Sequence, residues 1–358
     1  MRAAVCTGYG PAETVMEMRD DLPAPEPGRG EVVVRVLATS ANPIDARKRA
    51  GYGRALFERA RKPTFPWILG GDASGVVAAV GPGVSGVSQG DAVIGAPGPF
   101  RPGTYADQVA LKASEIAPKP AALSFAEAAA LPYAGLTAWS ALTRTAGLRP
   151  DAGAGRVALV NGASGGVGTV AVQLLKAWGW RVAATCSADA APLMEALGAD
   201  EVIDYRAEDF TERLAGLDLV FDAVGDGVDG MEARCLSVLK RPGGTYVTLV
   251  HPVVRSIDRF GLAPGGAAAA ATFMRRRLAA AGRGYGWAVF KPDGEALAAL
   301  AALVERGALR PVIGRVLPLE RVAEAHAALE RGGSRGKTVL TVDAEAAGPA
   351  PLHPALAG

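Results

Sequence analysis

The stretch that decides the fold is Val157-Ala-Leu-Val-Asn-Gly-Ala-Ser-Gly-Gly-Val-Gly168. A buried-strand run turns through a glycine-rich loop that contains Gly165 and passes directly into the helical sequence Thr169 to Trp178. Glycines permit the tight turn and let backbone N–H groups approach a pyrophosphate, while the helix N-terminus adds partial positive charge. Ala163 replaces the first glycine of the usual GxGxxG pattern. The strand–loop–helix context therefore carries the interpretation of this loop as a dinucleotide site.

The sequence around this loop alternates apolar strands with helical segments. The expected strands are Val157–Val160, Arg181–Thr185, Glu201–Tyr205, Leu217–Asp222 and Gly244–Val250. Strands and helices that alternate at these lengths predict βαβ units on a doubly wound parallel sheet, here over residues 125–290. Ser124, followed three residues later by Glu127, predicts a capping box at the first helix of this region.

Residues 1–124 have a different texture, with short strands separated by Gly and Pro turns, such as Glu31–Leu37 and Gly75–Val80. This pattern predicts a β-rich, barrel-like domain. The strand expected at Lys337–Val342 returns to it, so residues 291–343 are assigned to the same domain. Residues 344–358 are rich in Ala and Pro and are expected to be disordered.

The length and net charge of the chain limit the functions that it can have. A chain of 358 residues predicts two domains. A formal charge of +2 gives no broad reason to expect binding to nucleic acid or to an anionic membrane. The basic segments Arg54–Lys62 and Arg275–Arg277 are interpreted as solvated faces, with an acidic partner or RNA as the open alternative.

The three cysteines are widely spaced, which argues against a disulfide framework and for a reducing compartment. The N-terminus lacks the features of a signal peptide, and the Ala-rich stretch from Gly265 to Thr272 is too short to span a bilayer. We therefore expect a cytoplasmic protein without a membrane span.

The second strand of the parallel sheet bears on the choice of cofactor. NAD-preferring folds place Asp or Glu at its end, where the carboxylate binds the ribose 2′-hydroxyl. Here the strand ends in Cys186-Ser187. Ser187 can donate to a 2′-phosphate, and no carboxylate repels that phosphate at this position. Asp189 lies close in sequence and no Lys or Arg follows at once, which counts against this reading. The balance predicts NADPH.

Several motifs together resemble a known family. The chain resembles the zinc-free quinone oxidoreductases of the medium-chain dehydrogenase/reductase superfamily in three motifs: Asn42-Pro-Ile-Asp45, Leu131-Pro-Tyr-Ala-Gly-Leu-Thr-Ala-Trp139 and the glycine loop. More narrowly, it resembles the reticulon-interacting mitochondrial oxidoreductase subfamily in the motifs Leu197-Gly-Ala-Asp-Glu-Val-Ile-Asp-Tyr205, Thr245-Tyr-Val-Thr-Leu-Val250 and Gly336-Lys-Thr-Val339. The resemblance covers roughly residues 30–342.

This resemblance implies a GroES-like domain (1–124 and 291–343), a Rossmann domain (125–290) and a homodimer. It also implies which residues contact NADPH. The phosphates would be held at Ser164, Gly166 and Val167, the adenosine end at Ser187 and Tyr205, the nicotinamide at Leu249, Ala288 and Phe290, and the adenosine phosphate additionally at Arg335.

The residue types that zinc-dependent relatives need are missing. Their Gly-His-Glu position reads Gly70-Gly71-Asp72, and their first cysteine position falls in Ala41-Asn42-Pro43. We therefore expect no metal site. Without a Lewis acid an ordinary alcohol is hard to oxidise, whereas a quinone or conjugated carbonyl is already electrophilic. The expected reaction is NADPH-dependent reduction of a quinone or enone, with enoyl-thioester reduction or a non-catalytic NADPH-sensing or RNA-binding role as alternatives.

The candidate catalytic residues are Asn42, Asp45 and Tyr52, on the turn and helix start after a strand. Asn42 and Tyr52 could donate hydrogen bonds to the acceptor carbonyl. The alternative has equal weight, because Asn-Pro and Asp45 suit a turn and a helix N-cap without any chemistry.

Overall fold

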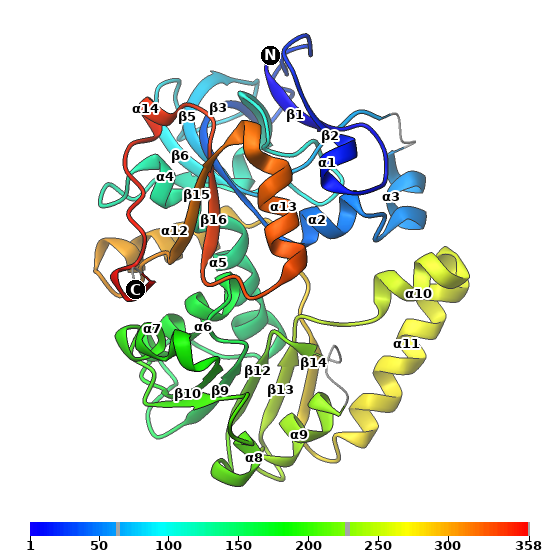
Figure 1. Ribbon diagram of the computed structural model, residues 1–358, viewed down its shortest axis with the longest axis vertical. Coiled ribbons are helices and arrows are strands. Elements are labelled where there is room, and N and C mark those ends of the chain that lie inside the picture. The colour runs from blue at the N-terminus through cyan, green and yellow to red at the C-terminus, as the bar shows by residue number, and fades with distance from the viewer. Residues whose placement is uncertain (62–64, 226–229, 357–358) are drawn as a thin grey trace. The chain divides into compact units, whose positions relative to one another are not determined.

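The computed structural model describes residues 1–61, 65–225 and 230–356. The chain divides into two compact units, which are shown in Figure 1. Unit 1 comprises Met1–Leu136 and Lys291–Leu352, and unit 2 comprises Thr137–Phe290 and His353–Gly358. Among the described residues, no helix combines the length and apolar character needed to cross a bilayer.

Unit 1 is rich in short strands. They are β1 (Ala3–Cys6), β2 (Met16–Arg19), β3 (Glu31–Ala41), β4 (Trp67–Ile68), β5 (Ala73–Val80), β6 (Ala92–Gly95), β7 (Gln108–Lys112), β8 (Ile116–Pro118), β15 (Ile313–Pro318) and β16 (Lys337–Thr341). The larger sheet has the order β15-β16-β3-β5-β6-β8, with β7 also paired to β3, and the smaller one has the order β2-β1-β4. Alternate side chains of β3, such as Val32, Val34 and Val36, lie in the main core of this unit. The last strand, β16, pairs antiparallel with β3, which joins the C-terminal segment to the N-terminal domain.

Helices surround these strands. They are α1 (Ala12–Val15), α2 (Pro43–Arg49), α3 (Arg54–Arg61), α4 (Phe125–Ala128), α5 (Pro132–Trp139, which runs into unit 2), α12 (Gly294–Glu305), α13 (Val322–Arg331) and α14 (Ala344–Ala347), with 3-10 turns η1 (Ala113–Glu115) and η5 (Leu319–Arg321). The capping box expected at α4 is confirmed, because Ser124 accepts from the backbone of Glu127, whose carboxylate accepts from the Ser124 N–H. The basic stretch that begins at Arg54 forms α3, and its Lys62 lies outside the described residues.

Two expectations differ from the structure. The domain boundary expected at residue 124 lies at residue 136, because α4 packs on the β domain, where Ala126 and Ala129 join Leu37 and Val339 in one cluster. The tail expected to be disordered contains α14, whose Ala347 is buried in that same cluster. Burial against α4 and β3, rather than local composition, orders this segment.

Unit 2 alternates strands and helices. Its elements are η2 (Ser140–Thr145, a π-helical turn), β9 (Val157–Asn161), α6 (Gly166–Ala177), β10 (Arg181–Cys186), η3 (Ala188–Ala190), α7 (Ala191–Ala196), β11 (Glu201–Asp204), α8 (Phe210–Arg213), β12 (Leu219–Asp222), α9 (Met231–Ser237), β13 (Thr245–Thr248), α10 (Val253–Phe260), α11 (Leu262–Ala279), β14 (Gly284–Trp287) and η6 (Pro354–Leu356). The sheet is parallel, with the order β11-β10-β9-β12-β13-β14.

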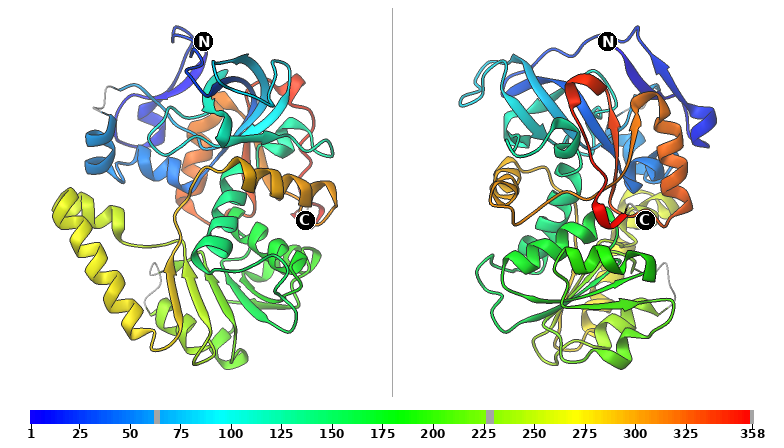
Figure 2. Two further views of the ribbon diagram at one scale, coloured as in Figure 1. Left: turned by 180° about the vertical axis from the view of Figure 1, so that it is seen from behind. Right: turned by 60° about the vertical axis from the view of Figure 1, so that its left-hand side comes forward.

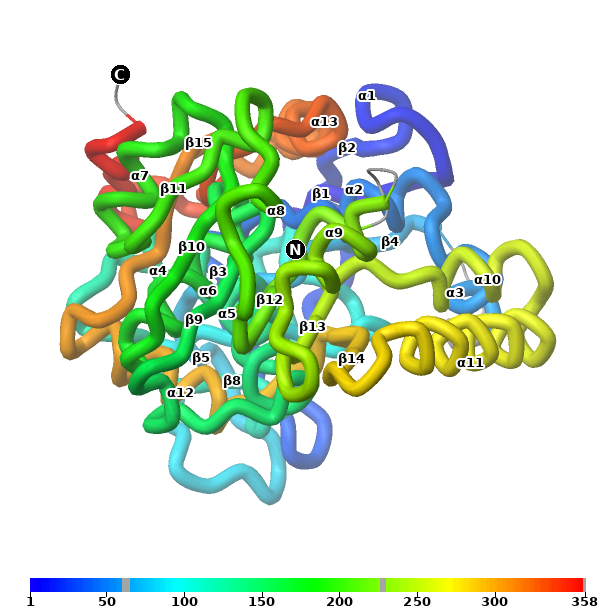
Figure 3. Tube along the Cα trace, turned by 90° about the horizontal axis from the view of Figure 1, so that it is seen from below, coloured from blue at the N-terminus to red at the C-terminus, as the bar shows by residue number. Residues whose placement is uncertain are grey.

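This strand order runs outward from β9 in both directions, which defines a doubly wound Rossmann sheet. Helix α6 packs against β9 and β10, and α9 packs against β12. Helices α10 and α11 form a hairpin on the β14 side of the sheet, as the two further views of Figure 2 and the tube in Figure 3 show. In such a sheet the chain reverses between β9 and β12, and ligands bind at the carboxyl ends of the strands beside this point.

Candidate functional site

The glycine loop lies at the carboxyl end of β9. Gly162 has φ of +77°, a left-handed conformation that disfavours other residues, and Gly165 forms the N-cap of α6. A Cβ on Gly168 would lie 2.4 Å from the carbonyl oxygen of Gly162, so the helix can approach the loop this closely only with glycine here. Ser164, Gly166 and their neighbours in the loop remain partly exposed. The free N–H groups of the first turn of α6 thus face a backbone cradle that fits a pyrophosphate.

A buried polar network underlies this loop. The carboxylate of Asp222, at the end of β12, accepts hydrogen bonds from Asn161 Nδ2 at 2.9 Å and Tyr246 Oη at 2.6 Å. Asn161 Oδ1 in turn accepts from Thr185 Oγ1 at 2.6 Å, and the Gly162 N–H donates to that same hydroxyl at 3.1 Å. Burial and the nearby Asp222 raise the pKa of Tyr246 well above its ordinary value, so its phenol remains a donor. The network joins the carboxyl ends of β9, β10 and β12 to the Tyr246 side chain of β13.

Sequence reasoning missed this network, although a signal for it exists. Asn161, Thr185, Asp222 and Thr248 each stand at or next to the last position of a parallel strand, and all four are buried. Polar residues in otherwise apolar strand ends at one edge of a sheet indicate either a ligand or a shared hydrogen-bond network.

The residues expected at the adenosine end lie on the first half of the sheet. Ser187 follows β10 and Tyr205 follows β11, where the Tyr205 N–H donates to the carbonyl of Cys186 at 3.1 Å. The structure therefore brings Ser187 and Tyr205 to one edge. Tyr205 is 56% exposed, which is unusual for a tyrosine and leaves its ring available for stacking.

The residues expected near the nicotinamide lie at the ends of β13 and β14. The Leu249 N–H donates to Asp222 O at 3.0 Å, and the Ala288 N–H donates to Thr248 O at 2.9 Å. Phe290, which is half-buried, ends this segment of unit 2. Close by, the His251 ring stacks on Trp287 with the ring centroids 5.5 Å apart. Burial lowers the pKa of His251, which keeps the imidazole neutral.

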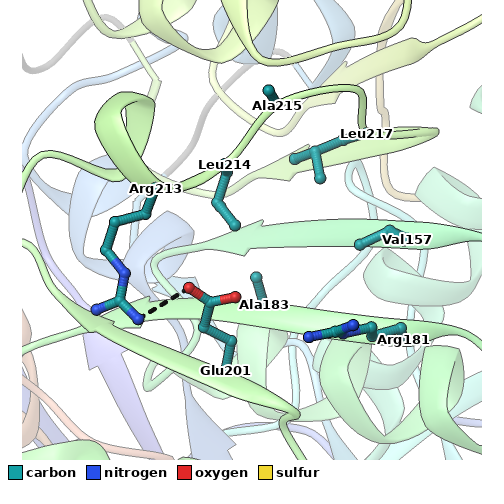
Figure 4. A pocket seen from close by; sticks show the side chains of 8 residues that line it. All are labelled: Val157, Arg181, Ala183, Glu201, Arg213, Leu214, Ala215 and Leu217. Atoms are coloured by element: carbon teal, nitrogen blue, oxygen red, sulfur yellow. Dashed lines mark ion pairs between the residues drawn. The ribbon is translucent and has the colours of Figure 1, made fainter.

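A separate pocket of about 200 Å³ lies at the opposite edge of the same sheet, and Figure 4 shows the side chains that line it. It is lined by Val157, Arg181, Ala183, Glu201, Arg213, Leu214, Ala215 and Leu217. Arg213 and Glu201 form an ion pair of 3.0 Å beside it. Because these residues stand at the amino ends of the strands, the pocket contains none of the expected cofactor contacts.

In unit 1, the candidate catalytic Asn42 belongs to a buried charged network. Its Nδ2 donates to Asp72 at 2.8 Å and to Asp45 at 3.2 Å, and its Oδ1 accepts from Lys337 Nζ. Lys337 Nζ also lies 3.4 Å from Asp72, and both side chains are buried. The Asp72 carboxylate additionally accepts from Ser40 Oγ at 2.5 Å. The amide of Asn42 is thus engaged within unit 1, and its contact with an acceptor carbonyl stays a prediction.

Asp45 joins this network from the first turn of α2. Its Oδ2 accepts from the N–H of Asn42, the N-cap of α2, at 3.1 Å, which completes a capping box, and from Tyr105 Oη at 3.2 Å. Burial raises the pKa of Asp45, and the nearby Asp72 adds to this effect. Asp45 and Asp72 are thus two neighbouring buried acids, with Lys337 as the cation closest to Asp72.

Tyr133 lies beside the same network. Its backbone N–H donates to Asp72 Oδ1 at 2.6 Å, and its ring lies against Gly71, where a Cβ would be 2.9 Å from Tyr133 Cδ2. Burial raises the pKa of the Tyr133 phenol, with Asp45, Asp72 and Tyr52 adding to the effect. Tyr52 is half-buried on the turn after α2, where its N–H bonds to Arg47 O at 2.8 Å. The structure therefore groups Tyr52 and Tyr133 with the candidate residues.

Arg335, expected at the adenosine phosphate, lies in unit 1 on the loop two residues before Lys337 and is half-exposed. Among the residues that the structure describes, no group of three or more His, Cys, Asp or Glu side chains has an arrangement that could hold a metal ion. Apart from Arg335, the expected cofactor residues lie in unit 2, whereas the Asn42 network lies in unit 1.

Comparisons with known proteins match both units. Residues 28–121 match the alcohol dehydrogenase GroES-like domain, and residues 197–340 match the zinc-binding dehydrogenase family. The NAD(P)H oxidoreductase RTN4IP1 of Mus musculus is 44% identical over 324 residues, which are 87% of this chain and 82% of the relative. The 2-methylene-furan-3-one reductase of Solanum lycopersicum is 33% identical and covers 95% of this chain and 79% of its own. The solved quinone oxidoreductase of Coxiella burnetii is 33% identical, with a TM-score of 0.79, and covers 96% of this chain and 99% of its own.

These relatives correct one expectation. The RTN4IP1 proteins of mouse, human, cattle and zebrafish are all named as mitochondrial. The prediction of a cytoplasmic protein is therefore wrong, and the relatives point to mitochondria instead. Cysteine spacing and the N-terminal sequence carried that prediction, and neither distinguishes the cytoplasm from another reducing compartment.

Proposed function

This chain belongs to the RTN4IP1 family of NAD(P)H oxidoreductases, within the medium-chain dehydrogenase/reductase superfamily, and from that premise we propose that it uses NADPH to reduce a quinone or another α,β-unsaturated carbonyl without zinc. One observation carries the zinc-free part of the proposal. Asp72 stands where zinc-dependent relatives have an acidic residue, and here its carboxylate is already bound by Lys337, Ser40 and the Tyr133 N–H. A buried ammonium supplies the positive charge at this position.

The unit 2 residues would bind and orient the cofactor. The N–H groups of Ser164, Gly166 and Val167 would hold the pyrophosphate, and Leu249, Ala288 and Phe290 would hold the nicotinamide end. When bound, the reduced nicotinamide supplies the hydride. The Asp222 network supports this assignment, because its hydrogen bonds link the glycine loop to β12 and β13. Such preorganisation keeps a reacting ring in place without further cost at the moment of reaction.

The unit 1 residues would polarise the acceptor. Reduction of a conjugated carbonyl or quinone moves negative charge onto oxygen, and a hydrogen-bond donor stabilises that charge. Tyr52 is the proposed donor, with Asp45 and Asn42 holding the turn on which it lies. The raised pKa of Tyr133 keeps a second phenol protonated beside this network.

A panel of quinones, enones and enoyl thioesters, with NADPH as the reductant, tests the substrate class. Turnover of quinones or enones with little on thioesters supports the proposal, and preferential turnover of thioesters would replace it by an enoyl-thioester reductase. Tight NADPH binding without turnover of any acceptor would favour a cofactor-sensing protein. Salt-sensitive RNA binding would favour the nucleic-acid alternative.

Two further parts of the proposal need their own measurements. Elemental analysis of the purified protein should find no stoichiometric zinc, and chelators should leave turnover intact. Sedimentation at equilibrium should show a homodimer, which the family resemblance implies.

A further inference from the structure

The carboxyl end of β10 presents two residues with opposite effects on a phosphate. The Ser187 hydroxyl donates a hydrogen bond to Asp189 Oδ1, and Asp189 is exposed. The hydroxyl that could donate to a 2′-phosphate is therefore already bound to a carboxylate. That carboxylate carries a negative charge, which repels a phosphate but accepts a hydrogen bond from a ribose hydroxyl.

An arginine lies at the neighbouring strand end. Strands β10 and β11 run parallel with Cys186 opposite Asp204, so the residues that follow each strand stand side by side. The guanidinium of Arg206 lies over the Tyr205 ring, 5.6 Å from its centroid. Arg206 is exposed, and no ion pair to it is recorded among the described residues. The Arg206 N–H donates to Asp204 Oδ1 at 3.1 Å, which anchors its backbone at this edge.

This arrangement rests on the proposed function and deepens it. We infer that Asp189 and Arg206 oppose each other in choosing between NADPH and NADH. Arg206 recognises the 2′-phosphate of NADPH from above the Tyr205 ring, and Ser187 donates to that phosphate only after its hydroxyl leaves Asp189. For NADH, Asp189 instead accepts from the free 2′-hydroxyl. The chain therefore binds both cofactors, and the two charges set the ratio of their affinities.

The ratio of NADPH affinity to NADH affinity should be modest, because the charges of Arg206 and Asp189 oppose each other. Arg206 attracts the phosphate, with the planar fork that suits bidentate phosphate binding. Asp189 repels the same phosphate from the β10 side. Removing either charge should move the affinity ratio in the opposite direction from removing the other, which a purely structural role would not do.

The test is fluorescence titration of the full chain with NADPH and with NADH, for the wild type and two charge-neutralising variants. Arg206→Gln should weaken NADPH binding by about tenfold, the scale of one hydrogen bond to a charged group, and change NADH binding by less than about twofold. It should also reduce the salt dependence of NADPH binding. Asp189→Asn should strengthen NADPH binding several-fold and should not strengthen NADH binding.

Two control variants distinguish the effect of where a charge lies from the effect of the protein's net charge. Arg181→Gln removes one arginine from the other end of β10, about 17 Å away along the strand. Glu195→Gln removes an exposed carboxylate from α7. Both controls should leave the NADPH to NADH ratio unchanged.

The outcomes distinguish this inference from the proposed function. A wild-type chain that binds neither cofactor would overturn the proposed function itself. If the wild type binds both, but Arg206→Gln weakens the two equally or Asp189→Asn leaves the ratio unchanged, only the inference about cofactor choice fails.

Discussion

The phenol oxygen of Tyr105 lies 3.2 Å from Nε2 of His326, and both side chains are fully buried. The other ring nitrogen, Nδ1, is buried without a hydrogen-bond partner among the described residues. Burial, with a smaller contribution from Arg49, lowers the pKa of His326 to about 3 from the ordinary value of 6.5. The folded protein therefore holds this imidazole neutral, and protonation of the unfolded chain competes with folding.

The first prediction follows from this pair. Because the folded pKa is lowered, the stabilisation is complete above the unfolded pKa of about 6.5 and is lost as the pH falls from there toward 3. At pH 5 the loss relative to pH 7 should be about 2 kcal/mol. His326→Gln keeps a neutral hydrogen-bonding side chain beside Tyr105 and should lack this loss. Urea unfolding at both pH values measures it, and parallel pH profiles for wild type and variant would contradict it.

The second prediction concerns the buried ion pair of Lys337 and Asp72. Lys337→Met leaves a buried carboxylate without its cation, which typically costs about 3–5 kcal/mol. The double variant Lys337→Met/Asp72→Asn removes the stranded charge and should be more stable than Lys337→Met alone. Lys112→Met, at an exposed lysine of β7, is the control and should have little effect. Equal destabilisation by the single and double variants would show that shape rather than charge matters here.

The third prediction contrasts two glycines of the same loop. A Cβ on Gly168 would lie 2.4 Å from Gly162 O and 2.7 Å from Ala163 Cα, and neither backbone atom can yield. Gly168→Ala should therefore lower the melting temperature as well as NADPH affinity. A Cβ on Gly165 has its nearest contact at 3.6 Å, so Gly165→Ala should fold normally. The methyl group added by Gly165→Ala would still prevent a pyrophosphate from approaching the backbone. Titration of this variant with NADPH should therefore show weakened binding. Unchanged affinity in Gly165→Ala would place the pyrophosphate elsewhere.

Part of the fold could be predicted from the sequence because its signals are local. The glycines after Val157–Asn161 mark a tight turn before a helix, and the Ser124–Glu127 capping box needs only four consecutive residues. The tail was predicted wrongly for the opposite reason. Its Ala347 is ordered by contacts with α4 and β3, and an Ala-rich stretch has no apolar periodicity that would indicate such contacts.

The candidate site could be predicted less completely, because its partners are distant in sequence. Lys337 lies 265 residues from Asp72, and Tyr246 lies 24 residues from Asp222, so no local pattern pairs them. Arg206 was missed for a related reason. No Lys or Arg directly follows Ser187 in the sequence, and Arg206 reaches this edge from the parallel strand β11 beside β10.

The fourth prediction concerns Arg335, which the family resemblance assigns to the adenosine phosphate. Arg335→Ala should cost about 1–3 kcal/mol of NADPH binding free energy, the range for hydrogen bonds to charged groups, and little for NADH. Isothermal titration with each cofactor measures the difference. Equal losses for both cofactors would show that Arg335 does not contact the 2′-phosphate, and Arg206 would then be the remaining cation proposed for it.

The last prediction concerns how the acceptor is polarised. If Tyr52 donates to the carbonyl as charge develops, its hydroxyl matters mainly in the transition state. Tyr52→Phe should then lower kcat and kcat/KM together while NADPH affinity stays unchanged. Losing one such donor from a water-excluded site typically costs about 10²–10³ in rate. The loss should be larger for weak enones than for quinones, because quinones are already activated. If the Tyr52→Phe variant turns over both acceptor classes at the wild-type rate, Tyr52 is a packing residue and not the donor. Tyr133→Phe, tested in parallel, would then show whether the second phenol, held beside Gly71 and Asp72, is the donor instead.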